Sequence, residues 1–456
     1  MRRIASRRAS LWLAAVLVGA VVAIAAAAGG ASAQHGALPG AKTPVIGAHP
    51  EYEYIGNYSS QPSLLVFGCQ TRTFPNPAGW CYGPDQIRTA YGIKPFLQNG
   101  YDGSGRTIVI VDAYGSPTIQ QDLALFDTAF DLPAPDFSIV NMPGVQPFNP
   151  ADPNQVGWSG EVSLDVQWAH AVAPGAKLVL LVAKTNDDAD ILAATQYAYD
   201  HKLGDVLSQS YGEAEQCMNP ALLAQQHQLF QAMSAADWTM FASSGDSGSD
   251  QPGCGPNDPP FQAASTPASD PEVTGVGGTQ LIATPVVISG GVITDPGGQY
   301  VRETAWNENA TFGAAGGGGY SVIYKRPDFQ APVVKDQKMR VVPDVAYNAA
   351  IDGGVITFWG VPFGPGAAFR FGGTSAGSPQ WSGLAAITDQ LAGGRVGNIN
   401  KTLYKLGKTD QNTYFHDIVD GNIGAFAAAP GFDAATGWGS PKTPALLPAI
   451  AKPGNG

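Results

Sequence analysis

Apolar positions in the first half of the chain alternate between short continuous runs and longer periodic stretches. The run RTIVIVDAYG begins at Arg106 and reaches Asp112 at the end of its apolar part. It is followed by SPTIQQDLALFDTAF, in which apolar residues recur at helical spacing after Ser116 as N-cap and Pro117 at the first helical position. This pattern predicts a buried strand followed by a helix.

The same alternation recurs further along the chain, in KLVLLVA (177–183) before DADILAATQYAYDH, DVLSQS (205–210) before PALLAQQHQLFQAMSAAD, and TMFASSGDSG (239–248). Buried strands that alternate with helices predict an α/β fold, with a mainly parallel central sheet and helices on both faces. Reacting groups in such folds lie at the carboxyl ends of the strands. Residues from about 272 to 370 change to short strands with glycine turns, which predict hairpins at one edge.

Composition supports a folded globular protein. The chain has 456 residues, 44% of them hydrophobic, which is enough for a sizeable core. Its formal net charge is −12, and four of its 25 basic residues lie within the first eight positions. No basic patch remains to neutralise phosphates, so we exclude nucleic acid as a partner.

The N-terminus has the pattern of an export signal. A basic segment precedes the apolar run Leu11 to Ala28, and Ala31-Ser32-Ala33 forms an A-x-A cleavage site before Gln34. We therefore predict a signal peptide at residues 1–33, a secreted protein and no membrane association after cleavage. The 18 apolar residues are also long enough to span a bilayer, so an uncleaved anchor is the alternative.

Residues 34–82 are polar and rich in Gly, Pro and Ser, and they predict an irregular N-terminal extension.

Four cysteines in an exported chain indicate two disulfides, for which three pairings exist. The simplest pairing joins near neighbours, Cys69 with Cys81 and Cys217 with Cys254. These spacings match no zinc site.

The stretch GGTSAGSP places Ser375 between a glycine turn and a predicted helix. Free N–H groups and the helix dipole at such a position stabilise an oxyanion, and the glycines allow a substrate backbone to approach. Ser375 is thus a candidate nucleophile. The alternative is that Thr374 or Ser375 only caps the helix.

A serine nucleophile requires a base, and none of the six histidines lies in a glycine-rich setting of the HGTH kind. The segment SGEVSLDVQWAHAVA offers carboxylates instead. If Ser159 caps a helix, Glu161 and Asp165 lie one turn apart on the same face, where two carboxyl groups can share a proton. His170 then faces away. The alternative is an ordinary solvated acidic face.

A third carboxyl group, Asp246, stands in ASSGDSGS, in the turn after an apolar strand. An aspartate in such a loop commonly caps a turn. If it is held protonated beside Ser375, it can instead donate a hydrogen bond to a developing oxyanion, which requires acid conditions.

The stretches GEVSLDVQ, SSGDSG and GTSAGSPQWSG occur in this order and resemble the signatures of the sedolisin family, the serine-carboxyl peptidases. The resemblance extends from about Cys81 to Pro441 and includes LSQSYGE, ETAWN, AGGGGYS, YKRPDFQ and VVPDVAYNA. It implies a subtilisin-like peptidase domain at residues 83–456 and activity in acid, as an endopeptidase or a tripeptidyl-peptidase. Family members usually carry a long N-terminal prodomain, whereas only residues 34–82 precede this domain.

The resemblance also implies roles for single residues. Glu161 takes the proton of Ser375, Asp165 shares the proton of Glu161, and Asp246 completes the oxyanion hole with the Ser375 backbone N–H. Asp112, at the end of the first predicted strand, is a candidate further carboxyl group that would support Glu161 and Asp165. The backbone of Ser210, Tyr211 and Gly212 would bind a peptide as an added strand.

The stretches FHDIVDG and APGFDAATGWGSP resemble the C-terminal calcium loop of the family. This resemblance implies one Ca²⁺ ion, held by the Asp417 and Asp433 carboxylates and by the carbonyls of Ile418, Ala429 and Gly431. The family commonly has glycine where this chain has Ala429.

Two functions compete. We expect a secreted, monomeric serine-type endopeptidase that cleaves polypeptides through an acyl-enzyme on Ser375. The alternative is an exported surface or binding protein that uses an inactive peptidase scaffold.

Overall fold

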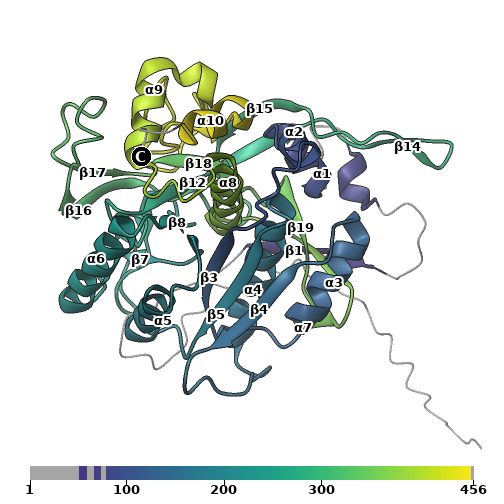
Figure 1. The fold of residues 1–456 in the computed structure, drawn as a ribbon, viewed down its shortest axis with the longest axis horizontal. Coiled ribbons are helices and arrows are strands. Elements are labelled where there is room, and N and C mark those ends of the chain that lie inside the picture. The colour runs from purple at the N-terminus through teal and green to yellow at the C-terminus, as the bar shows by residue number, and fades with distance from the viewer. Residues whose placement is uncertain (1–50, 59–65, 73–78, 453–456) are drawn as a thin grey trace, which may run out of the picture.

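The computed structural model describes residues 51–58, 66–72 and 79–452. Its centre is a sheet in which the strands lie in the order β15, β12, β8, β6, β3, β5, β4, with β18 beside β12 (Figure 1). All pairings in this sheet are parallel except that of β12 with β15. The strands are β3 (Thr107–Ala113), β4 (Asp136–Asn141), β5 (Lys177–Ala183), β6 (Val206–Gln209), β8 (Thr239–Ser243), β12 (Thr274–Ala283), β15 (Tyr300–Ala305) and β18 (Val345–Asn348).

Helices cover both faces of this sheet. Ile108 and Ile110 of β3 belong to a core cluster with residues of α3, α4, α8 and α10, whereas Val109 and Val111 belong to a second cluster with α5 and α6. Successive residues of a strand point to opposite faces, so the two clusters lie on the two sides of the sheet. The helices are α1 (Pro84–Ala90), α2 (Lys94–Gln98), α3 (Ile119–Phe130), α4 (Pro153–Val172), α5 (Asp188–Asp200), α6 (Pro220–Ala235), α7 (Gly360–Phe363), α8 (Gly377–Ala392), α9 (Asn400–Tyr414) and α10 (Thr443–Ile450). The predicted mainly parallel α/β architecture is confirmed.

Two predicted helix starts were wrong. Helix α3 begins at Ile119 after Thr118, so Ser116 is not its N-cap. Helix α4 begins at Pro153, where the Asp152 side chain accepts a hydrogen bond from the Asn154 N–H, so Ser159 lies inside the helix. An aspartate followed by proline is a strong start signal, and it adds almost two turns before Ser159.

The N-terminal extension contributes to a second sheet, of order β1, β20, β19, β2. We expected residues 34–82 to be irregular, yet β1 (Tyr52–Asn57) pairs antiparallel with β20 (Ala367–Phe371), and β2 (Cys81–Tyr82) pairs with β19 (Gly354–Phe358). Strand β1 forms because β20 offers it an edge and because Tyr52 packs against Trp359 and Phe369. The predicted signal peptide at residues 1–33 lies outside the described residues.

Both disulfides have the predicted near-neighbour pairing, Cys69–Cys81 and Cys217–Cys254. The first one ties the extension to β2, which belongs to the same small sheet as β1. The other short elements are β7 (Glu213–Ala214), β9 (Asp250–Gln251), β10 (Phe261–Gln262), β11 (Ser265–Thr266), β13 (Val287–Ser289), β14 (Val292–Asp295), β16 (Gly319–Lys325), β17 (Met339–Val342), β21 (Phe415–His416), β22 (Ser440–Pro441), and the 3₁₀ turns η1 (Gly68–Thr71) and η2 (Thr374–Ala376).

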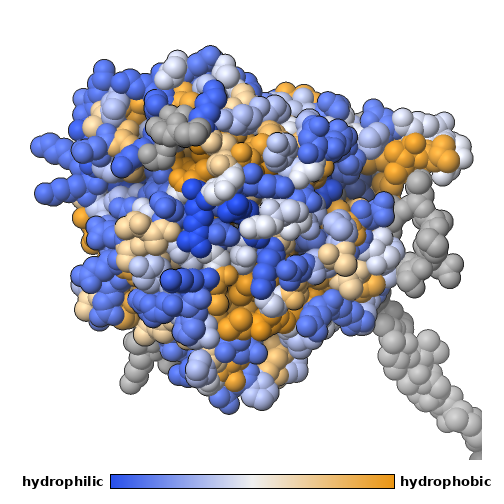
Figure 2. All heavy atoms as spheres, viewed as in Figure 1, coloured by the Kyte–Doolittle hydropathy of each residue, from blue (hydrophilic) through white to orange (hydrophobic). Residues whose placement is uncertain are grey.

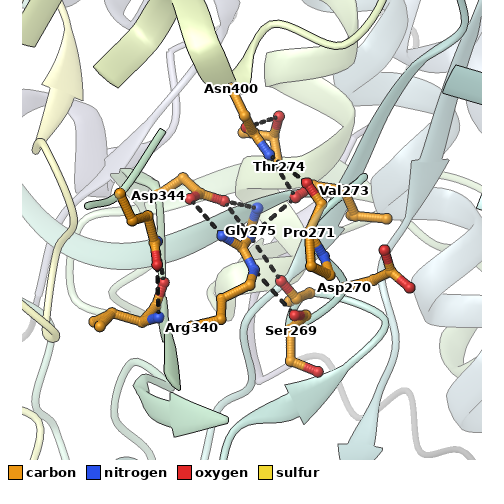
Figure 3. A network of polar contacts seen from close by, with 12 residues as sticks. Ser269, Asp270, Pro271, Val273, Thr274, Gly275, Arg340, Asp344 and Asn400 are labelled. Atoms are coloured by element: carbon orange, nitrogen blue, oxygen red, sulfur yellow. Dashed lines mark hydrogen bonds and ion pairs between the residues drawn. The ribbon is translucent and has the colours of Figure 1, made fainter. Parts of the chain in front are cut away.

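A buried ion pair connects β17 and β18 with β12. Arg340 is fully buried and pairs with Asp344, and it also donates hydrogen bonds to the carbonyls of Ser269 and Val273 (Figure 3). Asp344 in turn accepts from the Gly275 N–H of β12. Because every partner is satisfied, this pair avoids the cost of an isolated buried charge and fixes β12 relative to β17 and β18.

The surface carries one projecting hairpin, β13–β14, whose apolar residues are exposed (Figure 2). It leads into the edge strand β15, as expected from the glycine-rich segment that begins near residue 272. Within the described part of the chain, no helix has the length and apolar character needed to cross a bilayer.

Candidate active site

Ser375 lies where β20 passes through two glycines into η2 and then α8. Gly373 has a φ of 99°, and a Cβ there would lie 2.7 Å from Oδ2 of Asp246. Only glycine fits this bend, so the sequence Gly-Gly before Thr374 brings the serine turn close to the aspartate. Neither η2 nor α8 has a side-chain cap, so the alternative in which Thr374 or Ser375 only caps a helix is wrong.

Glu161 and Asp165 lie on α4, in the part of this helix from Trp158 to Val172 in which every residue is buried. Both carboxyl groups are fully buried. Helix α4 can pack closely against the Trp359 ring, because Gly160 has no side chain at this contact. The alternative of a solvated acidic face is therefore excluded, and the pair faces the interior beside η2.

The pKa of Glu161 is raised well above its ordinary value, first by burial and then by the charges of Asp165, Asp112 and Asp246. Contact with the Ser375 hydroxyl opposes this shift and lowers the pKa. Burial and the neighbouring Asp112 likewise raise the pKa of Asp165, whereas Ser210 and Glu161 lower it. Buried carboxyl groups this close cannot all ionise, so the set retains protons in mild acid.

The contact between Glu161 and Ser375 is looser than a normal hydrogen bond. The carboxyl oxygens of Glu161 and Asp165 accept no hydrogen bond of good geometry from the described residues. The Ser375 hydroxyl itself donates a long hydrogen bond of 3.4 Å to the Ser210 carbonyl. Such loose contacts are common in free enzymes and tighten when substrate binds.

Asp112 is the second-last residue of β3, and its charge acts on this pair. It is fully buried, and burial raises its pKa to about 7. Its charge affects both Glu161 and Asp165, so the sheet contributes a third carboxyl group to the pair on α4.

Asp246 follows β8 and contacts the serine turn. Its Oδ1 accepts hydrogen bonds from the Thr374 N–H and from the Thr374 hydroxyl, both at 2.7 Å. Burial raises its pKa to about 6, although the bonds from Thr374 lower it. In acid this carboxyl group is protonated, so it can donate a hydrogen bond next to Ser375.

The predicted substrate edge also lies beside the serine. Ser210 follows β6, and its hydroxyl donates to the Ser375 carbonyl at 3.2 Å. Tyr211 turns its side chain into the core, where its hydroxyl donates to Gln209, so this side chain is not available to a peptide. At Gly212 a Cβ would lie 2.3 Å from the Ser265 hydroxyl oxygen, which explains the glycine.

Histidines of the described residues take no part in this arrangement. His170 lies on α4 but bonds to the Pro133 carbonyl at 2.9 Å and lies 3.3 Å from Asp127. His227 bonds to Asp270, and His201 and His416 stack on tyrosines. His35 and His49 lie outside the described residues.

The two C-terminal loops come together around Asp417 and Asp433. Asp417 accepts from the Gly431 N–H, and Asp433 accepts from the Ala429 N–H at 2.9 Å. The segment 429–431 thus bridges both carboxylates, and the buried Ile418 lies directly after Asp417. No group of three or more Asp, Glu, His or Cys in the described chain forms a metal cluster. The predicted site contains only two such residues and otherwise uses carbonyls, a donor set of oxygens that suits Ca²⁺.

One carboxyl group near the site was missed in the sequence. Glu51, at the start of β1, is buried, and its carbonyl accepts from the Gly372 N–H at 2.7 Å. Burial and the charges of Asp246 and Glu308 raise its pKa to about 8. No local signal marks Glu51, because its neighbours along the chain are polar and its partners lie about 200 residues or more away.

Comparison with known proteins agrees with this geometry, although no family model matches the chain. Kumamolisin from Bacillus sp. (strain MN-32) is 34% identical over 444 residues, a match that covers 88% of this chain and 74% of kumamolisin. The chain belongs to the sedolisin family. It is a serine-type peptidase with a subtilisin-like α/β fold.

Two further comparisons involve the protein that gives this family its name. Sedolisin from Pseudomonas sp. (strain 101) is 29% identical over 403 residues, which cover 85% of this chain and 64% of the Pseudomonas protein. The solved structure of Pseudomonas sedolisin, a serine-carboxyl proteinase complexed with two molecules of pseudo-iodotyrostatin, superposes with a TM-score of 0.67 at 26% identity. That match covers 81% of this chain and 97% of the solved one.

Proposed function

We propose that this member of the sedolisin family is an exported endopeptidase that cleaves polypeptides in acid through an acyl-enzyme on Ser375. The observation that carries the proposal is the contact of the Ser375 hydroxyl with the buried Glu161 carboxyl, with no histidine of the described chain beside it. A neutral serine needs a base whose pKa lies near the working pH. A buried carboxylate provides such a base only in acid.

The reaction would begin with Glu161 accepting the Ser375 proton as Oγ forms a bond to the substrate carbonyl carbon. Asp165 and Asp112 keep a proton within the carboxyl set, so that only part of it is ionised. Protonated Asp246 and the Ser375 backbone N–H would stabilise the oxyanion. Glu161 then returns the proton to the leaving amine as the C–N bond breaks, and water hydrolyses the acyl ester by the reverse sequence.

These roles set a lower and an upper limit to the pH range in which the enzyme would be active. Glu161 must be ionised to accept a proton, which sets the acid limit. Asp246 must be protonated to donate, and its pKa of about 6 sets the upper limit. We therefore propose a working range in mild acid. We also propose a signal peptide at residues 1–33, a secreted monomer, and peptide binding along the backbone of Ser210, Tyr211 and Gly212.

The test is hydrolysis of casein by the purified protein at pH values from about 4, near the ordinary pKa of a carboxyl group, to about 6, near the pKa of Asp246. We expect internal fragments by mass spectrometry, and no fragments from the Ser375→Ala variant. A fluorophosphonate probe should label Ser375 in the parent protein alone. Release of only tripeptides would instead support a tripeptidyl-peptidase, and complete absence of cleavage and labelling would support the inactive scaffold.

We further propose that the C-terminal loops hold one Ca²⁺ ion through the carboxylates of Asp417 and Asp433 and the carbonyls of Ile418, Ala429 and Gly431. The ion would hold together two loops that lie beside β21 and β22. It supplies no catalytic group, because Ser375 obtains its base from α4.

Calcium removal is expected to lower the melting temperature. A ligand at 100 times its dissociation constant stabilises by about 2.7 kcal/mol, so chelation with EGTA should lower the melting temperature by roughly 5 °C. Asp417→Asn should melt at the lower temperature with or without Ca²⁺. Asp420→Asn, an exposed neighbour, is the matched control and should keep the full response to Ca²⁺. An unchanged melting temperature after chelation of the parent protein would reject the site.

A further inference from the structure

A polar cavity of about 430 Å³ is lined by residues that take part in none of the steps above. Its charged lining consists of Glu53, Glu308, Asp352 and Arg370, and Phe312 provides an apolar wall. A volume of this size is within the range of ligand-binding clefts.

The position of the cavity follows from the order of the strands. Ser210 follows β6, Asp246 follows β8, and Asn307 and Glu308 follow β15, while the sheet order is β6, β8, β12, β15. Asn307 and Glu308 line the cavity. Strand β15 runs antiparallel to β12, and its last residue, Ala305, pairs with Thr279 in the middle of β12. The residues after β15 and the proposed substrate edge at Ser210 therefore lie on opposite sides of β8, the strand that Asp246 follows. We take the cavity side to be the side of the peptide that follows the scissile bond.

The cavity also lies close to the oxyanion aspartate. Ala315 forms isolated β-bridges with both Asn307 and Ser247, and Ser247 is the residue after Asp246. On the other side, Glu51 of the extension is influenced by both Asp246 and Glu308. Ala315 thus joins the cavity lining to the segment of Asp246 by direct backbone contacts, and Glu51 lies within reach of the charges of both Asp246 and Glu308.

Strand β1 forms one wall of the cavity. Glu53 lies opposite Arg370 in the β1–β20 pairing, and the two side chains form an ion pair. Tyr54, the next residue, packs against Phe363 and Phe369. These contacts bury apolar surface and satisfy the charge of Arg370, so removal of β1 would leave both uncovered. The extension is therefore built into this side of the peptidase domain.

The lining suits a positively charged group. Arg370 is committed, because it donates to Glu53, Asp352 and the Trp80 carbonyl. Arg370 uses only part of the hydrogen-bonding capacity of the two carboxylates. The Glu53 side chain is 49% exposed, and that of Asp352 is 29% exposed. A carboxylate has about four acceptor positions, so both can accept further N–H groups. Phe312 can in addition contact the stem or the charged plane of an arginine.

We propose that this cavity is a subsite for an arginine or lysine side chain on the C-terminal side of the scissile bond, and that β1 is its permanent wall in the mature enzyme. The inference rests on the proposed function, since it names a substrate class for the same catalytic serine. Glu53 and Asp352 would receive the cation, and Glu53 comes from the N-terminal extension.

The test uses pairs of fluorogenic peptides that carry either arginine or citrulline at one of the three positions after the cleaved bond. Citrulline keeps the shape of arginine but has no charge. At about pH 5, above the ordinary pKa of a glutamate carboxyl group, we expect kcat/KM to favour arginine by roughly tenfold at one position. In Glu53→Gln this preference should fall to about threefold or less. Asp136→Asn, an exposed carboxyl group at the far edge of the sheet on β4, is the matched control and should keep the full preference.

Binding separates this inference from the proposed chemistry. In the Ser375→Ala background, fluorescence anisotropy should show the same arginine preference and the same loss with Glu53→Gln. If the parent protein cleaves no peptide while this binding preference persists, the peptidase proposal fails and the cavity proposal stands. Equal binding of the arginine and citrulline peptides, or a preference that Glu53→Gln leaves unchanged in a protein of unchanged melting temperature, overturns the subsite. N-terminal sequencing of active enzyme that begins after Asn57 would overturn the permanent role of β1.

Discussion

Glu161→Gln is expected to lower kcat for peptide hydrolysis by about 10³- to 10⁴-fold, the range for loss of a positioned general base. Glutamine has nearly the shape of glutamate, so α4 should pack as before. Its amide cannot accept the proton of Ser375, and within the described chain no histidine lies near enough to replace it. The measurement is kcat on a fluorogenic peptide in mild acid, together with the melting temperature of each variant.

A matched control makes this result specific. Asp122→Asn changes another buried carboxyl group, whose pKa burial raises to about 6, but Asp122 lies on α3 and accepts from the Gly360 N–H. This variant should retain activity within about twofold of the parent, as expected for a substitution away from the reacting groups. His170→Gln should likewise stay active. Glu161→Gln activity within tenfold of the parent, with an unchanged fold, would show that another group is the base.

Folding stability is expected to decrease as the pH rises from about 4 to about 8, because many buried carboxyl groups hold raised pKa values. Burial raises the pKa of Asp246 to about 6, of Asp112 and Asp389 to about 7, and of Glu51 to about 8. Between the ordinary and the raised pKa, the folded state binds more protons than the unfolded one. The free energy of unfolding must then fall with rising pH, so these groups stabilise the protein in acid.

The expected change in stability between pH 4 and pH 8 is large. A shift of two pKa units corresponds to about 3 kcal/mol for a single buried group, so several groups together should lower the melting temperature by about 10 °C or more between pH 4 and pH 8. His227, whose pKa is raised chiefly by its bond to Asp270, acts in the same direction. His416 acts in the opposite one, because burial lowers its pKa to about 4 and its contribution is lost as the pH falls.

Calorimetry across this pH range checks the prediction. Asp246→Asn removes one titrating group, so its melting temperature should depend less steeply on pH than that of the parent. Replacing the exposed Asp136 by asparagine should leave the slope unchanged. A melting temperature that rises from pH 4 to pH 8 in the parent would contradict the raised pKa values.

Local pattern was sufficient for the buried strands of the central sheet, whereas the candidate catalytic residues also needed the family resemblance. KLVLLVA at residues 177–183 coincides with β5, because a continuous apolar run must be buried on both faces of a parallel sheet. The spacing of Glu161 and Asp165 placed both on one helical face, and the family resemblance supplied their order relative to Asp246 and Ser375. The structure brings these four residues together: Glu161 and Asp165 lie on α4, which packs against η2, and Asp246, which follows β8, bonds to Thr374 beside Ser375.

Other features depended on partners far away in the chain. Strand β1 lies in a stretch that is polar and mostly exposed, and it becomes a strand only because the edge of β20, more than 300 residues later, is free to pair with it. The sequence alone determined the alternation of strands and helices and the chemistry of the motifs, because these depend on neighbouring residues. Only the tertiary structure decided the raised pKa values, the place of Glu51 and the cavity walled by Glu53, because burial and charge proximity arise when distant segments pack together.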